Sequence, residues 1–138
     1  MKKLIIYLTL ILSLSSCGFK TNKIYDYQDV ENLKIQWNEV FNHAKVDYFV
    51  YIYSQTCYYC ENIKQEIITF ALSDKYPTYF IEYIDDIEIC YDISKTLLKD
   101  NIDEICILGT PTLLDIQNNC LMNNIVGGQK IINFLENY

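Results

Sequence analysis

The spacing of hydrophobic and polar positions along the 138-residue chain predicts alternating helices and strands. After Asp29, apolar residues recur at three- and four-residue intervals as far as Ala44, which predicts an amphipathic helix with Asp29 as its N-cap. The next stretch, VDYFVYIY at 46–53, is almost continuously apolar, β-branched or aromatic. Such a run is typical of a strand covered on both faces. The pattern therefore predicts that the folded part of the chain begins with a helix and continues with a buried strand.

The same alternation continues to the C-terminus. A helical stripe begins at Cys57 and continues through Cys60, Ile63, Ile67 and Ala71. The later pattern predicts a strand at 78–84, a helix at 90–100, a hairpin of PTLLDI and LMNNIV turning at QNN, and a final amphipathic helix in QKIINFLENY. This order of elements predicts an α/β domain.

The N-terminus has the layout of an export signal. Two lysines precede an apolar run from Leu4 to Leu14, and small residues then lead to Cys17. The run is shorter than the roughly 20 apolar residues that a transmembrane helix needs. The ending LSSC resembles the bacterial lipobox, which implies that Cys17 is the lipidated mature N-terminus; an ordinary cleaved signal peptide is the alternative. The predicted parts are a signal peptide (1–16), a tether (17–28) and one domain (29–138).

Composition limits the partners that the chain can have. It contains no arginine and carries a formal charge of −7, which becomes −9 if the lysines of the signal segment are removed. An acidic protein has no general affinity for phosphate backbones, so nucleic acid is not expected as a partner. The roughly 120 residues left after the signal suit a single compact domain.

The CYYC motif at 57–60 could be a redox centre, half of a zinc site or a structural bridge. At a helix start, unpaired N–H groups and the helix dipole favour a thiolate, which is the attacking species in disulfide exchange. A zinc site needs four ligands, but apart from Cys17, which follows the signal segment, the chain offers only one histidine and three further cysteines, none of them in a second CxxC. The pattern therefore favours redox chemistry with no metal and no cofactor. Cys57 is expected to attack and Cys60 to resolve.

Three segments in order resemble the thioredoxin-like family: YIYSQTCYYC, GTPT at 109–112, and IVGGQKIINFL. The resemblance covers roughly residues 30–138 and implies a three-layer fold with a mixed central sheet flanked by helices. It also implies that Pro111 is a cis-proline beside the disulfide, and that Thr110 presents backbone groups to an extended substrate segment. The alternative for Pro111 is an ordinary turn proline that opens an edge strand.

Departures from cytoplasmic thioredoxin refine the resemblance. Thr56 replaces the tryptophan before the motif, and Tyr51 replaces the buried acidic residue six positions before the first cysteine. The threonine before Pro111 resembles extracytoplasmic reductases and isomerases, and the TCYYC and GTPT pair resembles the bacteriocin transport accessory proteins. Tyr58 and Tyr59 lie inside the motif, where an exposed ring offers an apolar surface for peptide docking.

Together these features predict a thiol-disulfide oxidoreductase that is lipid-anchored to a bacterial cell membrane and faces away from the cytoplasm. Its expected partners are cysteine-containing exported proteins and a redox partner protein. The alternative is a non-catalytic thioredoxin-fold accessory protein of a secretion or transport system. Neither the direction of electron flow nor the physiological substrate follows from the sequence. The remaining cysteines, of which one pair could be bridged, receive no assigned role: Cys90, Cys106 and Cys120.

Overall fold

A computed structural model of the chain describes residues 23–83 and 86–138. The predicted signal segment and Cys17 lie outside these residues. Within the described ranges, no helix has both the length and the apolar character needed to cross a membrane.

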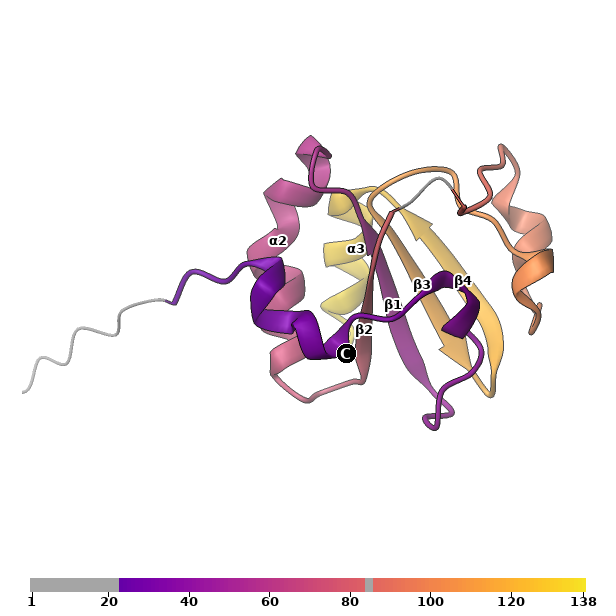
Figure 1. Cartoon of the computed structure of the whole chain (residues 1–138), viewed down its shortest axis with the longest axis horizontal. Coiled ribbons are helices and arrows are strands. Elements are labelled where there is room, and N and C mark those ends of the chain that lie inside the picture. The colour runs from indigo at the N-terminus through magenta and orange to yellow at the C-terminus, as the bar shows by residue number, and fades with distance from the viewer. Residues whose placement is uncertain (1–22, 84–85) are drawn as a thin grey trace, which may run out of the picture.

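A four-stranded mixed sheet forms the centre of the domain (Figure 1). Its strands are β1 (Tyr48–Tyr53), β2 (Thr78–Glu82), β3 (Thr112–Gln117) and β4 (Cys120–Val126), in the spatial order β2-β1-β3-β4. β1 pairs with β2 in parallel, whereas the β1–β3 and β3–β4 pairs are antiparallel. Every residue of β1 is buried, as expected for a central strand with both faces covered.

Helices cover one face of this sheet. α2 (Tyr58–Leu72) connects β1 to β2, α3 (Gly128–Leu135) follows β4, and the short 3₁₀ helix η1 (Tyr27–Leu33) packs beside α2 (Figure 1). Their buried side chains meet alternate residues of β1, which places Phe49, Tyr51 and Tyr53 in this core. Gly128 suits the close approach of α3 to α2, because a Cβ there would lie 3.0 Å from the Ile63 side chain, which would have to move by a few tenths of an ångström.

The opposite face has an irregular cover. Short 3₁₀ helices and connecting chain lie over the other residues of β1, namely Tyr48, Val50 and Ile52, and over the adjoining part of β4. These helices are η2 (Trp37–Glu39), η3 (Ile93–Thr96) and η4 (Ile102–Glu104). The third layer that the resemblance implied is therefore present, but without an α-helix among the described residues that form it.

Two predicted helices are wrong. The helix expected from Asp29 to Ala44 is divided into η1 and η2, because the chain between them is extended and Ile35 donates its backbone N–H to Phe80 O at 2.9 Å. The helix expected at 90–100 is reduced to the four residues of η3. In both places tertiary contacts use backbone groups that a helix would have used internally.

The hairpin prediction is confirmed. β3 and β4 meet at Asn118 and Asn119, which have φ values of 50° and 60°. Asparagine tolerates these left-handed conformations, which the two-residue turns that match strand twist require.

The topology confirms a thioredoxin-like α/β fold. A parallel β1-α2-β2 unit is joined to the β3–β4 hairpin and the closing helix α3 in one mixed sheet. The folded domain begins earlier than the predicted boundary at residue 29, because Tyr27 is buried and the side chain of Gln65 hydrogen-bonds both backbone groups of Tyr25.

Candidate functional site

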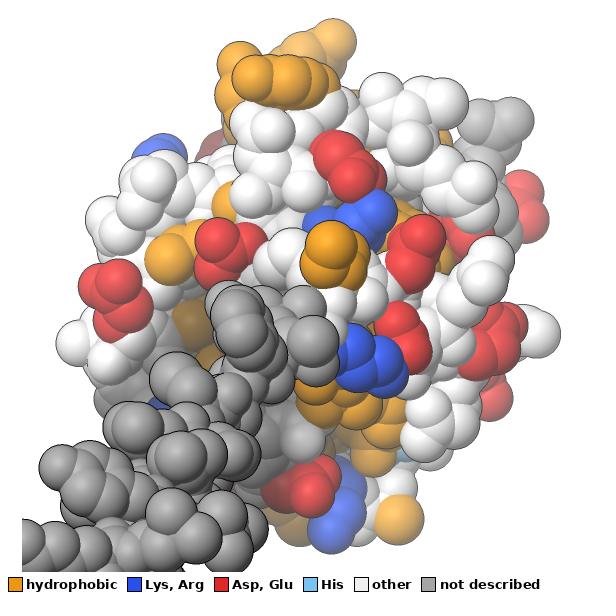
Figure 2. Space-filling view, turned by 90° about the vertical axis from the view of Figure 1, so that its left-hand side faces the viewer, with side chains coloured by type: hydrophobic (Ala, Val, Ile, Leu, Met, Phe, Trp, Pro, Cys, Tyr) orange, Lys and Arg blue, Asp and Glu red, His pale blue; other side chains and the backbone are white. Residues whose placement is uncertain are grey.

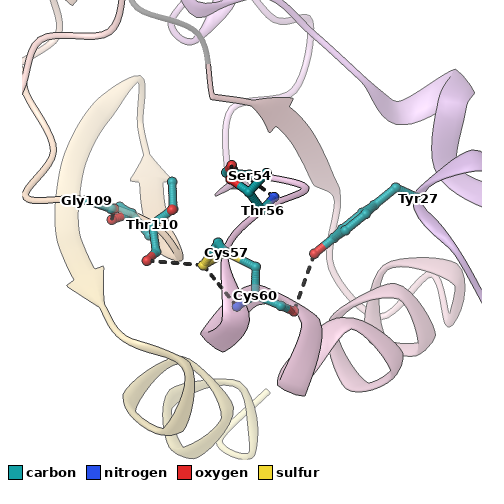
Figure 3. The surroundings of a disulfide bond; sticks show 8 residues. Tyr27, Ser54, Thr56, Cys57, Cys60, Gly109 and Thr110 are labelled. Carbon is teal, nitrogen blue, oxygen red and sulfur yellow. Dashed lines mark hydrogen bonds between the residues drawn. A yellow bond between two sulfur atoms is a disulfide. The ribbon is translucent and has the colours of Figure 1, made fainter.

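The redox motif lies where β1 ends and α2 begins. After Tyr53 the chain makes a turn in which the Cys57 N–H donates to Ser54 O at 3.1 Å. Cys57 is the N-cap of α2: its backbone is extended, and its sulfur accepts a hydrogen bond from the Cys60 N–H at 3.1 Å (Figure 3). The same N–H also donates to Cys57 O at 3.1 Å, so the sulfur and the carbonyl of the N-cap share this first-turn donor.

Cys57 and Cys60 form a disulfide with a Cα–Cα distance of 5.2 Å. Their exposures differ: Cys57 is half-buried, whereas Cys60 is fully buried on the sheet-facing side of α2. Because sulfur-to-sulfur attack needs access, a substrate can reach Cys57 but not Cys60. The structure thus gives the two cysteines the asymmetry that the attacking and resolving roles require.

The loop before β3 reaches the same place. We call residues 107–111 the Thr110 loop. The Thr110–Pro111 peptide bond is cis, and the Thr110 carbonyl oxygen lies 3.4 Å from Cys57 Sγ (Figure 3). The Thr112 hydroxyl donates to Gly109 O at 2.6 Å, and the Gly127 N–H donates to Pro111 O at 3.0 Å. These bonds hold the end of the loop against the start of β3.

Tyr58 and Tyr59 are the most exposed part of the motif. Their side chains are 73% and 65% exposed, and their rings meet edge to face. Figure 2 shows hydrophobic side chains protruding at the upper end of the molecule, which is the end where α2 begins in Figure 1. The structure therefore brings Thr110 beside Cys57 and leaves the two tyrosines open to a partner.

Behind the disulfide lies a group of buried tyrosines that the sequence did not identify as part of the site. The Tyr27 hydroxyl donates to Cys60 O at 3.4 Å, and its ring stacks on Tyr53 with centroids 3.7 Å apart (Figure 3). Tyr51 is fully buried, and its hydroxyl has no hydrogen-bond partner among the described residues. The signal in the sequence was positional, since Tyr51 occupies the place of the family's buried acid.

Burial makes these phenols hard to ionise. It raises the pKa of Tyr27 and of Tyr51 well above the ordinary value near 10. The neighbouring Tyr27 and Tyr53 raise the pKa of Tyr51 further, whereas Tyr51 opposes the rise at Tyr27. Burial also raises the pKa of Tyr53, against the opposing influence of Lys34. The group that fills this position in place of a carboxylate is therefore neutral at physiological pH.

The charged side chains nearest to the motif pair with each other. Lys64 on α2 contacts Glu61 at 2.8 Å and Asp26 at 3.6 Å. The Glu61 carboxylate, followed by the Asp26 charge, raises the pKa of Lys64. Since Lys64 is already paired, the main local stabilisation for a thiolate at Cys57 is the N-terminus of α2.

The other cysteines lie away from the motif in sequence. Cys90 and Cys106 form a second disulfide with a Cα–Cα distance of 5.8 Å, whereas Cys120 is not in a disulfide. In residues 23–83 and 86–138, no three side chains among His, Cys, Asp and Glu come together as a metal site would require.

No protein-family model matches the sequence, and neither does any curated protein. Among solved structures, the chain is similar to thioredoxin from Aeropyrum pernix, with 20% identity and a TM-score of 0.48 over 75% of this chain and 83% of that one. It is also similar to Chlamydomonas reinhardtii thioredoxin f2, with 14% identity and a TM-score of 0.46 over 76% and 94% of the two chains. Because these identities and TM-scores are low, the assignment of the thioredoxin-like fold rests on the topology and the site geometry described above.

Proposed function

We propose that this protein is a thiol-disulfide oxidoreductase in which Cys57 attacks and Cys60 resolves. One observation carries the proposal: a disulfide-bonded pair at the start of α2 has a reachable first sulfur and a fully buried second one. The reachable sulfur also accepts the Cys60 N–H, a bond that favours its thiolate form.

In the first step of the reductive direction, the Cys57 thiolate attacks one sulfur of a substrate disulfide. A bond forms between Cys57 and that sulfur, and the other substrate sulfur leaves as a thiolate. The product is a mixed disulfide between Cys57 and the substrate. One disulfide has replaced another, so the two-electron reduction of the substrate is not yet complete.

In the second step, Cys60 loses its proton and attacks Cys57 Sγ. The mixed disulfide breaks, the substrate leaves as a second thiolate, and the Cys57–Cys60 disulfide forms. The protein has then given two electrons to the substrate, and a redox partner protein must return them. The oxidative direction runs through the same intermediates in reverse.

Docking of the substrate is assigned to Thr110, Pro111, Tyr58 and Tyr59. The Thr110 carbonyl lies beside the reactive sulfur, where an extended peptide could pair with the backbone of the loop. The exposed rings of Tyr58 and Tyr59 offer apolar contact next to it.

We further propose that the protein acts outside the cytoplasm of a bacterium on cysteine-containing exported proteins. The N-terminal lysines, the apolar run and Cys17 support this location, with Cys17 as the lipid anchor. Two acyl chains at about 0.8 kcal/mol per buried methylene would hold the domain stably at a membrane surface.

A trapping experiment tests the chemistry. In the native host, Cys60→Ser should accumulate covalent complexes with exported proteins that dissolve on addition of reductant, because the resolving step is removed. Cys57→Ser should abolish them, and Cys120→Ser, which changes a cysteine outside both disulfides, should behave like wild type. Purified Cys60→Ser should likewise be trapped by a test disulfide peptide that wild type turns over.

The absence of any trapped species, together with a wild type that exchanges no test disulfide, would defeat the enzyme proposal. A non-catalytic accessory protein that uses this fold for peptide docking would then be the better description.

The anchor has a separate test. Wild-type protein should partition with membranes, and mass spectrometry should find acyl chains on Cys17. Cys17→Ser should block this modification. Wild-type protein that is recovered without acyl chains and cut at another site would remove the lipid-anchor proposal but leave the redox proposal intact.

A further inference from the structure

The second disulfide closes an irregular segment. Cys90 and Cys106 lie 16 positions apart, and the chain between them contains only the short 3₁₀ helices η3 and η4. Both cysteines are half-buried, so a dissolved thiol can approach them. A disulfide in such a position constrains a segment that little regular structure supports.

This disulfide lies next to the start of the Thr110 loop. The Cys90 N–H donates to Ile107 O at 2.9 Å, and the Ile107 N–H donates to Glu88 O at 3.0 Å. These two bonds form an isolated bridge between residues 89 and 107. The covalent tie at Cys106 thus reinforces the bridge from which the loop leaves.

The middle of the loop has few other ties. Ile107 is buried, but Leu108 is 45% exposed. Among the described residues, no backbone N–H of Leu108, Gly109 or Thr110 donates to another element. In the described part of the chain, the Thr110 carbonyl contacts Cys57 Sγ, at 3.4 Å, and no other hydrogen-bond partner. The placement of Thr110 therefore depends on how the loop is held at Ile107, at Gly109 by the Thr112 hydroxyl, and at Pro111.

We propose that Cys90–Cys106 is a second redox site, and that its reduction loosens the Thr110 loop and weakens docking of substrate at Cys57. This inference rests on the proposed oxidoreductase function. The reductant is a dithiol: one of its thiolates attacks Cys90 or Cys106, and its second thiol then resolves the mixed disulfide. Two electrons and two protons pass to the protein, which gains two thiols, and the dithiol becomes a disulfide.

The effect should be local. The core between the sheet and its helices contains neither Cys90 nor Cys106, whereas it does contain Cys60 and lies against Cys57. The irregular segment keeps other attachments to β4: Asn124 donates its side-chain amide to Cys106 O at 2.9 Å, and the Leu98 N–H donates to Leu121 O at 2.7 Å. Reduction therefore leaves the fold in place while it removes the covalent tie beside the loop.

The first test uses a Cys57→Ser/Cys60→Ser protein, in which dithiothreitol can reduce only Cys90–Cys106. Hydrogen exchange of the Cys90 and Ile107 amides, which form the bridge, is compared before and after reduction of the same protein. We expect exchange about tenfold faster at these amides and unchanged exchange in β1, as for a local opening. Unchanged rates at Ile107 and Cys90 overturn the proposal. A loss of protection throughout β1 also overturns it, because the Cys90–Cys106 disulfide would then stabilise the whole fold rather than the loop.

The second test keeps the Cys57–Cys60 pair and replaces Cys90 and Cys106 with serine. For a test disulfide peptide we expect KM to rise about fivefold and kcat to stay within about twofold, since docking rather than chemistry is changed. Cys120→Ser is the matched control and should leave KM unchanged. If hydrogen exchange shows that the loop is loosened but KM does not change, the proposed link between the disulfide and substrate docking is wrong. A wild type without any exchange activity defeats the proposed function, while the exchange rates of Ile107 and Cys90 still decide the first part.

Discussion

The two faces of the sheet are built differently although the same strands supply both. The helical face, where Phe49, Tyr51 and Tyr53 point, is covered by α2, α3 and η1. The irregular face, where Tyr48, Val50 and Ile52 point, is covered by 3₁₀ turns and loops that include one disulfide. Regular helices bury long continuous stripes of side chains, whereas the irregular cover relies on single anchoring residues.

The candidate site lies where these two kinds of cover meet. Cys57 and Cys60 belong to the start of α2 on the helical face, and the Thr110 loop comes from the irregular cover. In the proposed function the difference divides the two roles: the sulfurs proposed to react are held by a helix, and the loop proposed to dock substrate is held by a segment with little regular structure. Four predictions test or sharpen this comparison.

The largest expected effect is a difference in core stability. Ile67 on α2 and Ile105 in the irregular cover are both buried, at 0% and 1% exposure. We expect Ile67→Ala to lower the free energy of unfolding by about 3–4 kcal/mol and Ile105→Ala by about 2 kcal/mol, because loops collapse into a cavity more readily than helices do. Urea unfolding of the oxidised proteins measures both. Equal losses would show that the two covers are equally rigid.

The next effect concerns the two sulfurs at the start of α2. In the reduced protein, Cys57 should react with iodoacetamide about 100-fold faster than Cys60, because it is reachable and its thiolate is favoured by the helix N-terminus. Peptide mapping by mass spectrometry separates the two rates. Equal rates, or a faster Cys60, would reverse the proposed roles.

Alkaline pH should destabilise the fold. Burial raises the pKa of Tyr48 to about 12, and it raises the pKa of Tyr27 and Tyr51 still further. Above about pH 10 the unfolded tyrosines lose protons that the folded ones keep, so stability is complete below that pH and falls above it. We expect a loss on the order of 1 kcal/mol or more per pH unit between about pH 10 and pH 11. A urea midpoint that stays constant over this range would contradict it.

The smallest effect compares two buried tyrosines of β1 that lie on opposite faces of the sheet. The Tyr48 hydroxyl donates to Val40 O on the irregular face, whereas the Tyr51 hydroxyl on the helical face has no partner among the described residues. Tyr48→Phe should therefore cost about 1 kcal/mol of unfolding free energy, and Tyr51→Phe should be neutral or slightly stabilising. A marked loss in Tyr51→Phe would reveal a partner for its hydroxyl, such as a bound water.

The same comparison explains how much could be predicted from the sequence. The helical face has simple periodicities, and the strand at 46–53, the helix after Cys57 and the closing helix were predicted close to their observed positions. The hairpin was also predicted, because Asn118 and Asn119 favour the conformations that its turn requires.

On the irregular face, the helix predicted at 90–100 is absent for physical reasons. Leu98 takes a φ of 62° and gives its N–H to Leu121, which no helix spanning 90–100 allows. The pairing of Cys90 with Cys106 depends on how the chain folds back, and spacing alone does not determine it. In the site, the family resemblance predicted a cis-Pro111 beside the disulfide, and the Thr110–Pro111 bond is cis with Thr110 O 3.4 Å from Cys57 Sγ. The Tyr27 hydroxyl was not predicted, because it comes from a segment whose role depends on tertiary packing.

The irregular segments also protect the two outer strands of the sheet. Beside β2, the Ile35 N–H occupies Phe80 O, and beside β4, Leu98 and Lys99 exchange backbone hydrogen bonds with Leu121. Unpaired strand edges are templates on which other chains can add β-structure. Under the function proposed above, the protein would meet exported polypeptide chains as substrates. By occupying backbone groups at both margins, these segments reduce the risk that the domain itself seeds aggregation.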